Sequence, residues 1–290
     1  MSGTMQGAME FGAARDGGTG SALATRRLPA RSPAEVGATM ERLTRASPGE
    51  VVREVDTVLL RMGFDTRLAG QVQQLGYGFR EMNEEEMRSG GAAVTHAHDP
   101  ADLRAKVQGR QGAPIIAMHP QLLIDLRVFA ATHGHGRHGV DPNAQEFGAG
   151  TPGAVIRAIG ALYHERGHAK LESMLDNPPP WLRQEMTRLV QEHGGDEKKA
   201  RLILHESVGY HVGEVMQNWG RAMQAMQAGQ THGEAEAGYL KDMKETRDTP
   251  VTAFTGMGTF DDRLSPEARE QLRRWIPTIR DGYLRTPEGP

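Results

Sequence analysis

The feature that most constrains the fold is a long helix-forming stretch at residues 151–176, TPGAVIRAIGALYHERGHAKLESMLD. Thr151 is suited to the N-cap and Pro152 to the first helical turn, and the sequence NPPPW that follows ends the helix. An apolar stripe at helical spacing is formed by Val155, Ile159 and Leu162. We therefore predict a long helix that packs on a core and carries the polar sequence HERGH in its middle.

Further helices are predicted where a start signal such as Ser-Pro precedes apolar residues at helical spacing. These helices comprise residues 31–43, 47–64, 66–90, 120–134, 180–195, 196–227 and 265–284, the last interrupted near Pro277. A short strand is favoured by PIIAMH at residues 114–119. The sequence thus predicts a mainly α fold of the α+β type, with little strand.

Residues 1–32 are rich in Gly, Ala, Ser, Thr and Arg and contain few large apolar side chains. Such a segment buries too little surface to offset its ordering entropy, so we predict a disordered leader. It is either a dispensable tail or the leader of a specialised secretion system. For the remainder we expect a helical N-terminal subdomain at residues 33–110 and a second domain at residues 111–290, which contains HERGH.

Composition excludes several kinds of functional site. The chain has no cysteine, so disulfides, thiolate metal sites and cysteine nucleophiles are ruled out, and a metal site must use histidine and carboxylate. A net charge of −3 and an aromatic content of 5% give no support to nucleic-acid binding. No apolar run is long enough to span a membrane, and the N-terminal residues lack the apolar core of a signal peptide. We expect a soluble protein without a cleaved signal.

HERGH places two histidines one helical turn apart. His164 and His168 would project from one helix face, where two imidazoles can bind a tetrahedral ion at Zn–N distances of about 2.0–2.1 Å. Glu165 would lie close enough to take a proton from a water molecule on the metal. With 12 histidines in 290 residues, a chance match has odds of roughly one in twenty, so the rest of the chain must supply a third ligand.

A third ligand is expected on the predicted helix at residues 196–227. Its sequence LILHESVGYHVGEV carries four candidate groups among apolar residues: His205, Glu206, His211 and Glu214. Ionisable groups on a buried helix need partners, and a metal ion would supply one. Glu206 is the first choice and His205 or His211 the next, whereas Glu214 is suited to bond a motif histidine and fix its tautomer.

Glycines in both helices indicate close packing. Gly167 lies inside HERGH, although glycine costs about 1 kcal/mol in helix propensity relative to alanine. Gly209 and Gly213 lie one turn apart on the second helix. These glycines predict that another element approaches each helix backbone closely.

HERGH, followed downstream by HESVGYHVGE, resembles the zincin metallopeptidases and in particular the glutamate-zincin class. The continuation GHAKLESML and the helix ESVGYHVGEVM look most similar to bacterial toxin and effector members such as the anthrax lethal factor catalytic domain. The resemblance implies that His164 and His168 bind one zinc ion per chain, with Glu165 as general base and Glu206 as third ligand. It also implies a zincin-like fold in which two helices cross at the metal beside a short edge strand that aligns the substrate. Residues 113–119 are the candidate for that strand.

The resemblance departs from the family pattern at two positions. Arg166 stands where the family usually has an uncharged residue, and Lys170 stands where an apolar one is usual. Zincins also often carry a tyrosine or histidine that stabilises the oxyanion, a donor whose loss costs about 3–4 kcal/mol. Tyr210 and His211 are the first candidates because they share the helix of the third ligand, and two further residues are available, Tyr163 and Tyr239.

These features favour a zinc-dependent metalloendopeptidase that acts on a protein or peptide. The resemblance implies a bacterial effector or toxin that is made in the cytoplasm, leaves by a specialised secretion system and cuts a host protein. Two alternatives stay open. One is a non-catalytic protein in which the metal stabilises a binding surface or scaffold, and the other is a metal-dependent hydrolase of a non-peptide substrate. No nucleic-acid partner and no membrane span are expected.

Overall fold

The computed structural model describes residues 28–62, 64–88, 91–135, 152–227 and 263–275, together with residues 230, 234–235, 237–238, 241, 278–280 and 283–285. The helices are α1 (Pro33–Arg45), α2 (Pro48–Arg61), α3 (Leu68–Gln74), α4 (Glu84–Met87), α5 (Leu103–Val107), α6 (Pro120–Thr132), α7 (Pro152–Leu175), α8 (Pro180–Glu192), α9 (Glu197–Gln227) and α11 (Pro266–Arg273). The strands are β1 (Gly78–Glu81), β2 (Ala93–His96), β3 (Ile115–Met118), β4 (Thr278–Arg280) and β5 (Tyr283–Arg285).

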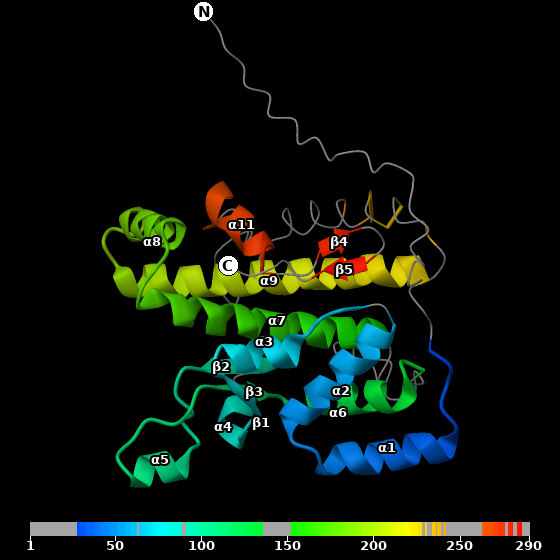
Figure 1. Cartoon of the computed structure of the whole chain (residues 1–290). Helices are drawn as coiled ribbons and strands as arrows, with labels where there is room; N and C mark the ends of the chain where they lie inside the picture. The colour runs from blue at the N-terminus through cyan, green and yellow to red at the C-terminus, as the bar shows by residue number, and fades with distance from the viewer. Residues whose placement is uncertain are drawn as a thin grey trace, which may run out of the picture.

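Two long antiparallel helices, α7 and α9, run side by side through the middle of the molecule (Figure 1). On the outer side of α7 lie α2, α3, α6 and a small sheet, and α1 packs on α6. On the outer side of α9 lie α8 and α11. The expectation of a mainly helical fold with little strand is confirmed. Among the described residues, no helix combines the length and the apolar character needed to cross a membrane.

Helices α1 and α2 begin where the Ser-Pro signals predicted. Ser32 and Ser47 are the N-caps, and each completes a capping box with the glutamate three residues later, Glu35 or Glu50. Helix α2 contributes an apolar face that packs against α6. Its buried residues are Val51, Val52, Val55, Val58 and Leu59. The N-terminal helices are therefore anchored by local caps and by one shared core.

The sheet has the strand order β1-β3-β2, with β1 parallel and β2 antiparallel to the central strand β3. Thr95 of β2 lies opposite Ile116 of β3, and His96 lies opposite the next position, Ile115. Because side chains alternate between faces along a strand, Thr95 and His96 point to opposite faces of the sheet. Strand β2 packs beside α7. The alternation of its side chains between the two faces of the sheet therefore directs Thr95 toward that helix and His96 away from it.

The strand expected at residues 113–119 is present as β3, but it lies at the centre of the sheet and not at an edge. Its continuous apolar sequence, IIAM, is what a strand buried between two neighbours requires. The edge strand beside α7 is β2, which was not predicted from the sequence. Strands from both sides of the expected boundary at residue 110 pair with each other in this sheet.

Two expected helices are shorter than predicted. The stretch at residues 66–90 forms α3, β1 and α4, because Gly76 adopts a left-handed φ of 80° after α3 and Asn83 starts a new helix by capping Glu86 N–H. The stretch at residues 265–284 forms α11 and then the antiparallel pair β4 and β5. At residues 66–90, turn-forming residues therefore outweigh the helical periodicity.

Glycines set the close approach of α7 and α9. A Cβ on Gly167 would lie 3.5 Å from the Cα of Gly209, within contact distance of the opposite backbone. A Cβ on Gly213 would lie only 2.9 Å from the carbonyl oxygen of Gly160. The predicted close packing at these glycines is therefore confirmed.

The two residues that depart from the zincin pattern face the C-terminal region. Arg166 is buried, and its guanidinium donates a 2.8 Å hydrogen bond to the carbonyl oxygen of Trp275. The Lys170 ammonium lies over the Trp275 ring, 4.6 Å from the ring centroid, in a cation–π contact. Both side chains therefore join α7 to the residues that follow α11.

Residues 1–27 of the expected leader lie outside the described residues. Residues 28–32 pack on the fold. Leu28 is 8% exposed and belongs to the core, and Arg31 donates a 3.2 Å hydrogen bond to the carbonyl oxygen of Ala130 in α6. Residues 28–32, the end of the expected disordered leader, are therefore packed.

Candidate metal centre

Three side chains from α7 and α9 converge on one point. The Nε2 atoms of His164 and His168 lie 2.9 Å apart, and Oε2 of Glu206 lies 3.9 Å from Nε2 of His164. One possible ligand atom from each residue lies within 4.8 Å of the other two. The side chains of His164 and Glu206 remain 18% and 25% exposed, so solvent reaches the group. Two imidazoles and a carboxylate are a donor set that fits zinc.

The local structure of both helices explains this convergence. His164 and His168 share a face because they are one turn apart on α7. The opposing helix leaves room for the first ring, since a Cβ on Gly209 would lie 2.7–2.9 Å from three of its atoms. Glycine at this position therefore allows the His164 imidazole to lie against α9 near Glu206, which is one turn before Gly209.

Burial disfavours charge on all three candidate ligands. It lowers the pKa of His164 to about 4, and together with the neighbouring His164 and His205 it holds the pKa of His168 well below its ordinary value. Burial also raises the pKa of Glu206. Both histidines are therefore neutral at pH 7, the form in which imidazole binds a metal. A divalent cation would offset the cost of burying the Glu206 carboxylate.

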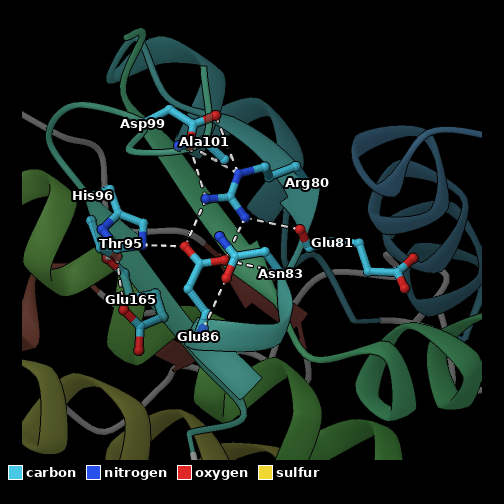
Figure 2. A network of polar contacts seen from close by, with 9 residues as sticks. All are labelled: Arg80, Glu81, Asn83, Glu86, Thr95, His96, Asp99, Ala101 and Glu165. Atoms are coloured by element: carbon cyan, nitrogen blue, oxygen red, sulfur yellow. Dashed lines mark hydrogen bonds and ion pairs between the residues drawn. The ribbon is translucent and has the colours of Figure 1, made fainter. Parts of the chain in front are cut away.

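Glu165 lies beside β2 and is 8% exposed. The hydroxyl oxygen of Thr95 lies 2.8 Å from its Oε2 and 2.9 Å from its backbone carbonyl oxygen (Figure 2). A protonated Glu165 carboxyl satisfies both contacts, because it donates to Thr95 while the threonine hydroxyl donates to the carbonyl. Burial raises the pKa of Glu165 to about 7, so this protonated form is well populated near neutral pH.

An ion-pair network of Arg80, Glu86, His96 and Asp99 lies on the other face of β2 (Figure 2). Arg80 donates to both carboxylate oxygens of Glu86 at 2.7 Å and to Asp99 at 2.9 Å. Nε2 of His96 lies 2.6 Å from Glu86. Because Arg80 is on β1 and His96 is on β2, the network ties both outer strands across β3. The network thereby holds β2 in the position from which the Thr95 side chain contacts Glu165 on α7.

The other candidates for the third ligand lie elsewhere. His205 approaches His168 from the opposite ring nitrogen, with the two Nδ1 atoms 3.4 Å apart. His211 is 2% exposed and Glu214 is half-buried, and neither belongs to the three-residue group. Glu206 is the candidate whose ligand atom approaches both motif histidines.

The candidates for oxyanion stabilisation differ in their access to the centre. The Tyr210 ring is half-buried and packs edge-on against His164, with centroids 4.8 Å apart and planes at 87°. Tyr163 is fully buried and its hydroxyl donates a 2.6 Å hydrogen bond to Thr66, so the expectation that it is available is wrong. His211 is too buried to contact a substrate in an open site. Tyr239 lies outside the described residues.

Two residues of the centre were not predicted from the sequence, Thr95 and Glu172. Oε1 of Glu172 lies 3.2 Å from Nε2 of His205, and its carboxylate accepts a 2.8 Å hydrogen bond from Arg201. The contact with His205, and then that with Arg201, lower the pKa of Glu172 to about 2 against the opposing effect of burial. Glu172 follows His168 by one helical turn, a spacing visible in the sequence, whereas Thr95 carries no such local signal.

Comparison of the chain with models of protein families, with curated proteins and with solved structures found no match in any of the three. The candidate metal centre therefore rests on its own geometry. That geometry is the convergence of two neutral imidazoles and one carboxylate, beside a second carboxylate of raised pKa.

Proposed function

We propose that the chain is a zinc-dependent metalloendopeptidase that holds one zinc ion between His164, His168 and Glu206. The observation that carries this proposal is the approach of one ligand atom from each residue to within 4.8 Å of the others. Glu165, next to the first histidine on α7, supplies the carboxylate that peptide hydrolysis needs. The resemblance of HERGH and HESVGYHVGE to glutamate-zincins supports the same assignment.

A zinc ion at this position would polarise the carbonyl of a peptide bond and lower the pKa of the attacking water. Glu165 would accept the proton of that water and pass it to the leaving amine. Its pKa of about 7 in the metal-free protein suits a group that both takes and gives a proton near neutral pH. The Thr95 hydroxyl, 2.8 Å from Oε2, would hold the Glu165 carboxyl in place.

We propose that an extended peptide binds along the edge of β2 that is unpaired among the described strands. Backbone hydrogen bonds to a strand edge bind a peptide largely independently of its side chains. Strand β2 is suited to bind a peptide because its position is fixed on both faces. Thr95 contacts Glu165 on one face, and His96 joins the ion-pair network on the other. The resemblance to toxin and effector metallopeptidases supports a host protein as the substrate and export from a bacterium as the setting.

Tyr210 is the proposed donor to the oxyanion that forms when the carbonyl is attacked. It lies on α9 one turn after Glu206, and its ring packs against that of His164. Its side chain is half-buried, and we propose that its hydroxyl faces the bound substrate. Loss of such a donor costs about 3–4 kcal/mol of transition-state stabilisation.

The experiment that tests the function separates metal binding from proton transfer. Glu165→Gln keeps the size and hydrogen bonding of the side chain but removes the base. Zinc content should therefore match the wild type, while cleavage of a proteome-derived peptide library should fall by about 10² or more. Elemental analysis and mass spectrometry of the products measure the two quantities.

The matched control is Glu81→Gln, an exposed glutamate on β1 that lies outside the three-residue group. It should keep both the zinc and the wild-type rate of cleavage. Undiminished cleavage by the Glu165→Gln protein would rule out the proposed mechanism, and loss of zinc from it would assign Glu165 to the metal instead.

A further inference from the structure

The His168 ring is contacted on both of its nitrogens. Nε2 faces the proposed metal position and lies 2.9 Å from Nε2 of His164. Nδ1 faces away from it and lies 3.4 Å from Nδ1 of His205 on α9. The planes of His168 and His205 are inclined by only 25°, with centroids 5.5 Å apart. His205 therefore lies behind His168 as seen from the metal position.

The contacts continue from His205 toward the surface. Its Nε2 lies 3.2 Å from Oε1 of Glu172, and the Glu172 carboxylate accepts hydrogen bonds of 2.8 and 3.0 Å from Arg201. His168 and Glu172 are one turn apart on α7, and Arg201 and His205 are one turn apart on α9. Side-chain exposure rises outward, from 14% for His205 to 29% for Glu172 and 51% for Arg201.

One arrangement of protons fits the order of groups in this row, in which Nε2 of His205 and Oε1 of Glu172 lie 3.2 Å apart without hydrogen-bond geometry. A metal bound to Nε2 of His168 uses the lone pair of that nitrogen, so the neutral ring carries its proton on Nδ1. That N–H donates to Nδ1 of His205, which must accept and therefore carries its own proton on Nε2. The Nε2–H of His205 then faces the carboxylate of Glu172, an acceptor that is itself paired with Arg201.

We propose that His205 and Glu172 are positioning residues that set the tautomer and the ring orientation of His168 for metal binding. This inference rests on the proposed metal centre and deepens it. Groups that accept the second ring N–H of a metal-bound histidine fix its tautomer and raise its basicity, and their loss weakens metal affinity by about 10- to 100-fold. His205 is thus neither the third ligand nor a group that touches the substrate.

Zinc affinity, measured by competition with a chromophoric chelator, tests the proposal without any need for activity. We expect His205→Ala to raise the dissociation constant for zinc by about 10- to 100-fold. His205→Asn should recover part of the loss, because an amide oxygen can accept near the position of Nδ1. Glu172→Gln should give a smaller rise than His205→Ala, because His205 itself remains in place.

The matched control is Lys198→Ala, an exposed residue that lines the same surface depression as Glu172 and His205. It should bind zinc with wild-type affinity. Equal affinity of the wild-type and His205→Ala proteins would overturn the proposal. Failure of the wild type to bind zinc would overturn the metal centre and this proposal together. Because the wild type is measured first, this outcome is distinguished from a failure of the positioning role alone.

A second readout uses the wild-type protein and does not depend on how well a variant folds. In the zinc-loaded protein, nitrogen-15 NMR of the histidine rings reports which nitrogen carries the proton and which binds the metal. We expect His168 to bind through Nε2 with its proton on Nδ1, and His205 to carry its proton on Nε2. Metal bound to His168 Nδ1, or to His205 itself, would overturn the assignment.

Discussion

The candidate metal centre on α7 and α9 and the ion-pair network on the other face of β2 both combine basic side chains with carboxylates, but their pKa values shift in opposite senses. In the network, hydrogen bonds with Glu86 raise the pKa of Arg80, and those from Arg80 lower the pKa of Glu86 to about 2. In the metal centre, burial lowers the pKa of His164 to about 4 and raises the pKa of Glu206.

The difference shows that the ion-pair network neutralises its charges internally, whereas the candidate metal centre does not. In the network, opposite charges lie within hydrogen-bond distance, so pairing outweighs burial and the charged forms are favoured. In the candidate metal centre, burial outweighs the opposing effect of His205 on the pKa of Glu206. Ionisable groups held together at such a cost are typical of a binding site, whereas fully paired groups are typical of a structural network.

Gly209→Ala is expected to have the largest effect on the metal centre. The added Cβ would lie 2.7–2.9 Å from the His164 ring, so that ring must leave its place near Glu206 or α9 must shift. We expect zinc binding to be lost and the free energy of unfolding to fall by about 1–3 kcal/mol. Zinc titration and chemical denaturation measure the two effects.

The control for this change is Gly37→Ala in α1, where an added Cβ meets nothing within 4 Å. It should leave zinc binding unchanged and should not destabilise the protein. Wild-type zinc affinity in the Gly209→Ala protein would show that the position of the His164 ring does not matter for the metal.

Arg80→Ala is expected to destabilise the sheet without changing the affinity for zinc. The Arg80 and Glu86 side chains are only 19% and 9% exposed, so the change removes the arginine that pairs with the buried Glu86 carboxylate. The free energy of unfolding should fall by about 3 kcal/mol, while zinc affinity stays the same. Arg88→Ala is the matched control, because Arg88 and Glu84 are 79% and 87% exposed and 3.8 Å apart. Similar stability of the two variants would mean that the network is not structural.

In the metal-free protein, Glu86 of the network and Glu165 beside the candidate metal centre should contribute to stability with opposite pH dependence. The folded pKa of Glu86, about 2, lies below the ordinary 4.5, so its contribution to stability is present above pH 4.5 and lost as the pH falls toward 2. The folded pKa of Glu165, about 7, lies above 4.5, so its contribution is present below pH 4.5 and lost as the pH rises through 7.

Urea denaturation with a chelator present, across this pH range, measures both contributions. Each should amount to about 1–3 kcal/mol over its interval. The difference between the wild-type and Glu86→Gln profiles should contain the loss below pH 4.5, and the difference between the wild-type and Glu165→Gln profiles should contain the loss between pH 4.5 and 7. Loss of both contributions in one variant would contradict the separation of the two regions.

The helices that carry the centre could be predicted because their signals are local. Pro152 and the prolines after residue 176 bound α7, and the four-residue spacing of His164 and His168 puts both on one face. The close approach of α9 to another element could be predicted from Gly209 and Gly213, which lie one turn apart. Glu206 could be predicted as a ligand because the apolar residues around it indicated a buried helix, on which a carboxylate needs a partner.

The part of the site contributed by the sheet could not be predicted, because it depends on pairing between distant segments. Strand β2 is short, and its edge position follows from its pairing with β3 and not from its own sequence. Thr95 contacts Glu165, which lies 70 residues further along the chain. The same limit made residues 113–119 look like an edge strand, since an apolar run does not reveal how many neighbours it has.

The central claim is that His164, His168 and Glu206 bind one zinc ion. Diffraction from crystals of the zinc-loaded protein, measured on both sides of the zinc absorption edge, tests it most directly. We predict one anomalous peak per chain, about 2.0–2.2 Å from Nε2 of each histidine and from one Glu206 oxygen. A peak held by His205 in place of Glu206 would contradict the third ligand, and the absence of any peak at the histidine pair would contradict the claim itself.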